Sequence, residues 1–115
     1  NERPIYLQLV EALRQSIVAR TFAPGERLPS VRELALQAKV NPNTMQKALS
    51  ELESAGLIYT ERTNGKFVTT DSGAIDKARS ALAEEKAQRY LREMKSIGLS
   101  ASEAAAYLTK EVNET

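Results

Sequence analysis

The sequence predicts a mainly α-helical protein with one small β-hairpin: a winged helix-turn-helix domain over residues 1–70, followed by a two-helix region over residues 71–115. Three observations support this interpretation. Two helices with clear start signals follow each other within three residues near position 40. An Asn-Gly dipeptide separates two short β-forming runs. An Ala-, Lys- and Glu-rich stretch then predicts a long helix and a shorter one.

The first helix is expected from Pro4 to Arg20, because proline suits a first helical turn and the apolar residues recur at helical spacing. A second helix is expected to open at Ser30, since Ser30 and Glu33 have the spacing of a capping box, and to end near Lys39. The third has Asn41 as its cap and Pro42 in its first turn. It runs to Ala55, and Gly56 is placed to terminate it.

Two further segments complete the predicted domain. Arg27 and Leu28 are compatible with a very short strand, and residues 57–61 and 66–70 with the two strands of a hairpin. In this hairpin Asn64 and Gly65 supply the positive φ angles of a tight turn. We interpret Tyr59 and Phe67 as hairpin core rather than as a base-stacking platform, because two aromatic residues without a basic sheet face are weak evidence for single-strand binding.

After the hairpin, a helix is expected from Ala74 to Ile97, ended by Gly98, and a last one from the second capping box, Ser100 and Glu103. The long helix carries an apolar stripe that no further domain is available to cover. A second copy of the chain is the simplest cover, so we predict a homodimer. The residues expected in the dimer interface are Ala87, Tyr90, Leu91, Met94 and Leu108.

Composition narrows the possible functions. The chain of 115 residues has no Cys and no His. The commonest transition-metal ligands and the usual acid–base group at neutral pH are therefore missing, and we predict no enzymatic activity, no metal site and no cofactor. The sequence also lacks a long apolar run and a secretory signal pattern, so we expect a cytoplasmic protein without membrane association. Sixteen basic residues against 15 acidic ones leave a polyanionic partner open.

In a winged helix-turn-helix, the second helix of the pair lies in the DNA major groove with its first residues at the base edges. The exposed residues at the start of that helix are expected to be Asn43, Thr44, Gln46 and Lys47, a set suited to base edges and phosphates. Arg32, Lys39, Arg62 and Lys66 would supply electrostatic attraction to the phosphate backbone.

Three motifs occur in order along the chain: LPSVRELA (28–35), VNPNTMQKAL (40–49) and LESAGLI (52–58). They are followed by Gly65-Lys66-Phe67-Val68. Together these motifs resemble the DNA-binding domain of GntR-type bacterial transcription regulators. The resemblance implies that Arg32 contacts DNA, that Thr44 contacts phosphate and that Gly65 approaches the minor groove at the wing tip. Many members have Arg where this chain has Pro42 and Gln46, so Gln46 and Asn43 are expected to read different bases.

The short two-helix tail is similar to the YtrA branch of the family, which implies dimerisation through the tail and repression of transcription. The leading hypothesis is therefore a homodimeric, sequence-specific binder of a pseudo-palindromic duplex operator, with half-sites about one helical turn or slightly more apart. The alternative is a winged-helix module for protein contacts without DNA binding. The operator sequence, the regulated genes and any small-molecule effector cannot be identified from the sequence.

Overall fold

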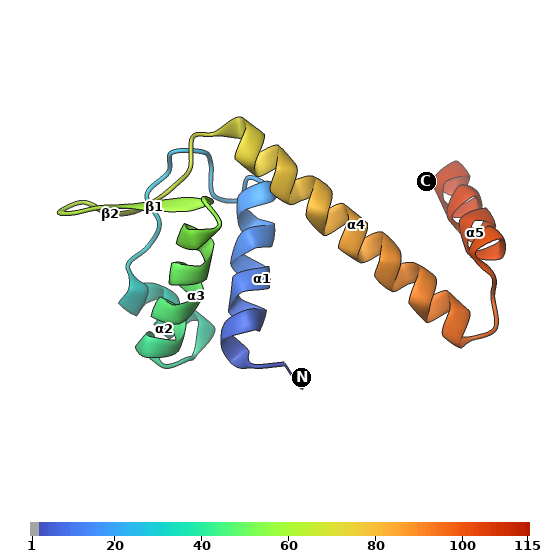
Figure 1. The fold of residues 1–115 in the computed structure, drawn as a ribbon, viewed down its shortest axis with the longest axis horizontal. Helices are drawn as coiled ribbons and strands as arrows, with labels where there is room; N and C mark the ends of the chain where they lie inside the picture. The colour runs from blue at the N-terminus through green and yellow to red at the C-terminus, as the bar shows by residue number, and fades with distance from the viewer. Residues whose placement is uncertain (1–2) are drawn as a thin grey trace. The chain divides into compact units, whose positions relative to one another are not determined.

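The computed structural model describes residues 3–115, which form five helices and one two-stranded antiparallel hairpin (Figure 1). This order confirms the predicted fold class. The elements are α1 (Ile5–Val18), α2 (Val31–Ala38), α3 (Pro42–Ser54), β1 (Ile58–Glu61), β2 (Gly65–Val68), α4 (Ser72–Ser96) and α5 (Ala101–Glu114).

The chain forms two compact units that divide inside α4, between Arg79 and Ser80. The predicted boundary at residue 70 lies before this helix. The first turns of α4 belong with the N-terminal unit because Ile75 is fully buried and Arg79 binds the end of α1. Its guanidinium donates from Nε to the Val18 carbonyl over 3.1 Å, and a second nitrogen of the same group donates to the same oxygen. A cation at a helix C-terminus compensates carbonyls that have no partner within the helix.

The core of the N-terminal unit is built around α3, against which both α1 and α2 pack. Apolar residues of α3 recur every three or four positions and form one stripe with no more than 2% exposure. Truncating such a fully buried leucine to alanine costs about 2–5 kcal/mol. The buried residues of this core include Ile17, Leu34, Met45, Ala48, Leu49, Leu52, Ile58 and Val68.

Local signals in the sequence determine where the helices begin and end. Both predicted capping boxes are present: the Ser30 hydroxyl accepts from the Glu33 amide and the Glu33 carboxylate accepts from the Ser30 amide, and Ser100 and Glu103 repeat the pattern. The Asn41 side chain caps α3, and Gly56 follows α3 with a φ of +79°. Only a residue without a side chain adopts that angle at little cost. These signals place the polar start of α3 directly after α2.

The hairpin turn differs from the predicted one, in which residues 62–65 separate the strands and both Asn64 and Gly65 have positive φ angles. Glu61 pairs with Gly65, so the loop contains the three residues 62–64. Among the described residues only Arg20 and Lys39 have a positive φ without being glycine, so Asn64 does not; Gly65 does, at +101°. The Asn64 amide donates to the Glu61 carbonyl, which closes a β-turn directly before Gly65. β1 therefore ends at Glu61 as expected, whereas β2 begins at Gly65, one residue earlier than expected, and ends at Val68, two residues earlier.

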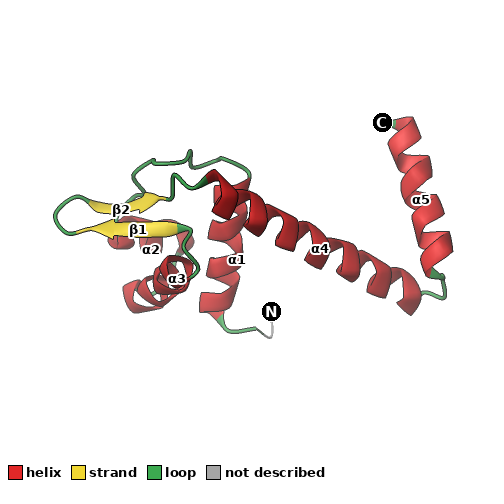
Figure 2. Ribbon diagram, turned by 45° about the horizontal axis from the view of Figure 1, so that its top comes forward, coloured by secondary structure: helices red, strands yellow, loops and turns green. Residues whose placement is uncertain are grey.

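A third segment joins the hairpin. Arg27 forms an isolated antiparallel bridge with Phe67, which confirms the very short strand expected at this position. The amide of Leu28 donates to the Lys66 carbonyl over 2.8 Å, and the amide of Val68 donates to the Glu26 carbonyl over 2.9 Å. We call the hairpin of residues 58–68 the wing, and it lies beside α2 and α3 in the N-terminal unit (Figure 2).

In the C-terminal unit, α5 is tied to the second part of α4 by a hydrogen bond. The Tyr90 hydroxyl donates to the Ala104 carbonyl over 2.7 Å, and Ala104 is fully buried. Gly98 has a φ of +91° and ends the turn after α4, as expected. Among residues 3–115, no helix combines the length and the apolar character that crossing a membrane requires.

Candidate nucleic-acid interface

The exposed side of α3 carries the polar residues that the sequence analysis selected. Because Met45, Ala48 and Leu49 are buried, the rotation of α3 about its axis is determined and Asn43, Gln46 and Lys47 face the solvent. Thr44 is half-buried beside them. The structure thus brings four predicted residues together within two turns at the start of one helix.

The start of α1 shapes one edge of this surface. The Lys47 ammonium lies 3.9 Å from the centre of the Tyr6 ring, a cation–π distance. Ile5 and Tyr6 line a shallow depression together with Asn43, Thr44 and Lys47. Thr44 and Lys47 therefore face α1, and the Tyr6 ring limits where the Lys47 charge can lie. This contact between Tyr6 and Lys47 was not predicted from the sequence.

Gln46 lies at the other edge of α3. Its amide nitrogen is 3.3 Å from the Ser50 hydroxyl, one turn further along the helix. Both groups are exposed, so this weak bond leaves the amide oxygen available. An amide that points outward from the start of such a helix has the donor and acceptor pair that fits adenine in the major groove.

α2 contributes Arg32, whose side chain is exposed next to the capping box. Hydrogen bonds with Ser30 hold the pKa of the Glu33 carboxyl below its ordinary value of 4.5, and the nearby Arg27 charge lowers it further. Glu33 is therefore a charged acceptor for the helix start at neutral pH. Lys39 ends α2 in the left-handed conformation, with a φ of +58°, and is exposed.

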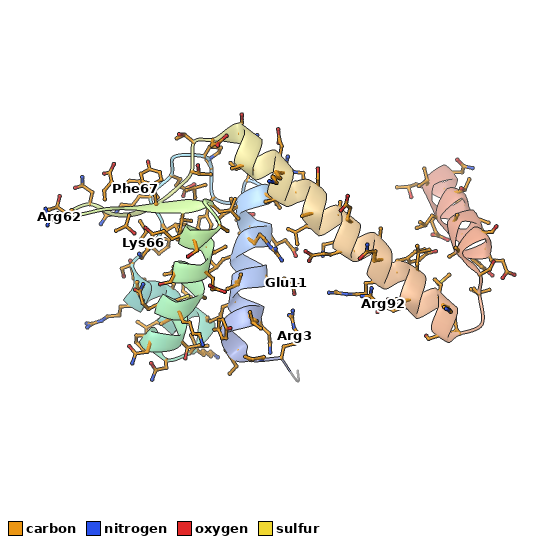
Figure 3. The ribbon with its side chains drawn as sticks, viewed as in Figure 1. Arg3, Glu11, Arg62, Lys66, Phe67 and Arg92 are labelled. Atoms are coloured by element: carbon orange, nitrogen blue, oxygen red, sulfur yellow. The ribbon has the colours of Figure 1, made fainter. Side chains whose placement is uncertain are left out.

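Lys66 occupies a different environment from the one expected of a free phosphate contact. Its side chain is only 17% exposed and points from the wing toward α3 (Figure 3), where its ammonium lies 3.5 Å from the Glu53 carboxylate. The same ammonium donates to the Thr60 hydroxyl over 2.9 Å, and that hydroxyl donates to Glu53 over 3.0 Å. These three side chains connect both strands of the wing with the last turn of α3.

The wing has a second, outer face. Tyr59 and Phe67 stack there with their ring centres 5.6 Å apart, and Phe67 points away from Lys66 (Figure 3). The two rings contact each other as expected, but Tyr59 is 37% exposed, so describing the pair as core is only partly correct. The strands have no third layer to bury this face. Arg62 lies exposed at the tip of the wing (Figure 3).

Arg27 was not among the functional residues predicted from the sequence, although it borders the predicted wing-tip glycine. A Cβ atom built on Gly65 would lie 3.3 Å from the Arg27 Nε and 3.5 Å from its Nη2. Gly65 therefore leaves the space that the guanidinium occupies. A signal was present in the chain, because Arg27 precedes the buried Leu28 in the segment expected to form a short strand.

The residues expected in a dimer interface separate into two groups within the C-terminal unit. Tyr90 and Met94 are half-buried within their own chain. Ala87, Leu91 and Leu108 remain exposed, the last two at 40% and 49%. The structure also exposes Ile97, Tyr107 and Val112 in this unit.

Comparisons with known proteins agree with this architecture. Residues 5–68 match the family described as bacterial regulatory proteins, gntR family. Two Bacillus subtilis proteins match along most of their length. The uncharacterized HTH-type transcriptional regulator YhcF is 38% identical over 90% of this chain and 85% of that protein. The HTH-type transcriptional repressor YtrA is 35% identical over 93% of this chain and 78% of that protein.

Two solved structures extend the comparison. A GntR family transcriptional regulator from Listeria monocytogenes superimposes with a TM-score of 0.85 at 36% identity, covering 96% of each chain. The DNA-binding domain of AraR in complex with operator ORR3 covers 60% of this chain and 83% of its own, with a TM-score of 0.57 and 32% identity. The matches to YtrA and to the Listeria protein include both helices of the C-terminal unit, which confirms the predicted resemblance. The chain belongs to the gntR family of bacterial regulatory proteins, and it is a transcription regulator rather than an enzyme.

Proposed function

We propose that this protein binds duplex DNA sequence-specifically, with α3 in the major groove and the wing against an adjacent groove or the backbone. The observation that carries the proposal is the outward-facing set of Asn43, Gln46 and Lys47 at the start of α3, held in orientation by a core stripe on the opposite side. Amides and an ammonium at this position match the groups that helix-turn-helix proteins use at base edges. Thr44, Arg32 and Arg62 are assigned to the phosphate backbone, and Gly65 to the close approach at the wing.

Dimerisation through the C-terminal unit is the second part of the proposal. Five of the eight large hydrophobic residues that are exposed among the described residues lie in this unit, at Leu91, Ile97, Tyr107, Leu108 and Val112. A segment as short as residues 80–115 rarely maintains its own core without disulfides, metal or association. A second copy of the same surface would cover these side chains and generate two-fold symmetry.

A two-fold symmetric dimer with one α3 per protomer fits a pseudo-palindromic operator. The name of YtrA as a repressor and the AraR operator complex support the same interpretation for this chain. Occupying a promoter in this way would prevent transcription. We therefore propose a homodimeric repressor that acts on chromosomal DNA in the cytoplasm.

The experiment that tests this function is selection of bound sequences from a random duplex library, repeated at two salt concentrations. Phosphate contacts lose affinity steeply as salt rises, whereas base readout determines which sequences are enriched. The proposal predicts an enriched inverted repeat at both concentrations. Binding without enrichment that disappears at the higher salt would contradict sequence-specific recognition.

The variant Asn43→Ala, Gln46→Ala provides the matched control for this selection, because both side chains are exposed and their removal leaves the core unchanged. We expect the double variant to fold and to lose the enrichment. An unchanged selected motif would show that α3 does not read the bases.

A further inference from the structure

Arg27 is built into the wing through its backbone. The residues on either side of it, Glu26 and Leu28, exchange hydrogen bonds with β2, and Arg27 itself is paired with Phe67. Residues directly opposite each other in an antiparallel pair point to the same face, and so do residues two positions apart on one strand. The Arg27 side chain therefore lies on the outer face of the wing, which also contains Phe67 and Gly65.

The guanidinium extends along this face toward the tip. Its Nε and Nη2 lie within van der Waals distance of the place where a Gly65 side chain would begin. Gly65 is the first residue of β2 after the loop of residues 62–64, so the Arg27 charge lies at the base of the wing-tip loop. A glycine at this point lets the guanidinium lie close to the backbone at the base of the loop.

Arg27 and Lys66 differ in how much of their charge is already compensated. No ion pair between residues 3 and 115 includes Arg27, and its side chain is exposed. Glu33 is close enough to Arg27 for the charge to lower its pKa, but Glu33 uses its carboxylate to accept from the Ser30 amide. Lys66, in contrast, is mostly buried and has both Glu53 and Thr60 as partners.

We propose that Arg27 is the phosphate-contacting residue at the base of the wing, and that Lys66 is a positioning residue that holds the wing against α3. The inference rests on the proposed function and replaces the expected role of Lys66 as a phosphate contact. A guanidinium presents several donors in one plane and matches the geometry of a phosphate. For Lys66 to reach DNA, its contacts with Glu53 and Thr60 would first have to break.

Salt dependence of DNA affinity tests the proposal, since each phosphate contact contributes about 0.9 to the slope of log K against log salt concentration. We would measure the affinity of the full chain for its selected operator and for a random duplex. The variants are Arg27→Gln, Arg27→Lys and Lys66→Gln, with Lys110→Gln as the control because Lys110 is an exposed cation in the C-terminal unit. Thermal unfolding confirms that each variant is folded.

Arg27→Gln is expected to weaken binding to both duplexes about tenfold and to reduce the slope by about one, while Arg27→Lys keeps the slope. Lys66→Gln is expected to keep the slope and to weaken operator binding more than random-duplex binding. An unchanged slope in Arg27→Gln would overturn the role of Arg27. A slope reduced by about one in Lys66→Gln would overturn the positioning role of Lys66.

A double-mutant cycle with Glu53→Gln provides a second test of Lys66. If Lys66 acts through Glu53, the double variant Glu53→Gln, Lys66→Gln loses no more operator affinity than either single variant. Additive losses would overturn the positioning role. Failure of the wild-type chain to bind any duplex would instead contradict the proposed function itself, so the two failures are distinguishable.

Discussion

The Lys47 ammonium lies over the Tyr6 ring at 3.9 Å from its centre, so a cation of α3 is held by the first turn of α1. The contact joins two helices that are far apart in the sequence and restricts the position of a residue assigned to the DNA interface. A side chain that is already ordered loses less conformational entropy on binding.

The first prediction concerns this contact. Tyr6→Leu is expected to remove a coupling of about 0.5–1 kcal/mol between Tyr6 and Lys47, because leucine has no aromatic face for the ammonium. Tyr6→Phe is the matched control, since it keeps the ring and removes only the hydroxyl. Urea unfolding of the single variants and of their combinations with Lys47→Gln measures the coupling. If the coupling energy with Lys47 is the same whether position 6 carries leucine or phenylalanine, the cation–π interpretation is contradicted.

Base readout by Gln46 is the second prediction. Gln46→Ala is expected to cost about 1–3 kcal/mol on the preferred operator and to relax the preference at one position in each half-site. Titration of operators with single base changes measures this loss of preference. Ser50→Ala serves as the control, because it removes the hydroxyl 3.3 Å from the Gln46 amide without removing the amide. If Gln46→Ala weakens binding to every sequence equally, Gln46 does not read a base.

Oligomeric state provides the third prediction. Leu108→Glu places a charge on the exposed apolar surface of α5 and is expected to convert the dimer to a monomer in sedimentation velocity. Leu36→Glu is a matched control, since Leu36 is also a large exposed apolar residue, at 72%, but lies on α2. It is expected to leave the dimer intact. A Leu108→Glu variant that sediments as a dimer would remove α5 from the interface.

The fourth prediction uses the depressed pKa of Glu33. A carboxyl whose pKa is lowered by folding stabilises the protein above its ordinary pKa of 4.5, and this contribution is lost as pH falls through the folded-state value. Glu33→Gln keeps an acceptor for the Ser30 amide but removes the charge. The stability difference between wild type and Glu33→Gln should therefore be present at neutral pH and shrink as the pH falls below the ordinary pKa of 4.5.

Thermal unfolding across this pH range measures that difference, and Glu84→Gln, an exposed carboxyl elsewhere in the chain, is the control for the loss of one negative charge. A difference for Glu33→Gln that does not change with pH would show that the charge of the capping box contributes nothing to stability.

Local signals account for the parts of the fold that the sequence predicted well. The signals that start helices act over three residues or fewer, so their effect can be inferred without the tertiary structure. They are Ser30 with Glu33, Asn41 with Pro42, and Ser100 with Glu103. The start of α4 was placed two residues late. The Asp71 carboxylate accepts from the amides of Gly73 and Ala74 there, and this N-terminal cap was not identified in the sequence.

The features that were not predicted from the sequence depend on contacts between residues far apart in the chain. The hydrogen bond from Arg79 to the Val18 carbonyl joins residues 61 positions apart, and no short sequence motif predicts it. This contact has a practical consequence: removing the tail after residue 71 would also remove buried Ile75 and the cap of α1, so a shortened protein should retain the chain through Arg79. Pairing of Lys66 with Glu53 likewise depends on how the wing folds back on α3. Sequence alone identified Lys66 as a cation but could not reveal that its charge is compensated.

The proposed function requires that two protomers read one inverted repeat. The most direct measurement is the mass of the complex, by sedimentation, on the selected operator and on a duplex that contains a single half-site. The proposed function predicts two chains per operator and much weaker binding to the half-site, because linking two contacts raises apparent affinity. One chain per operator, with equal affinity for the half-site, would contradict it.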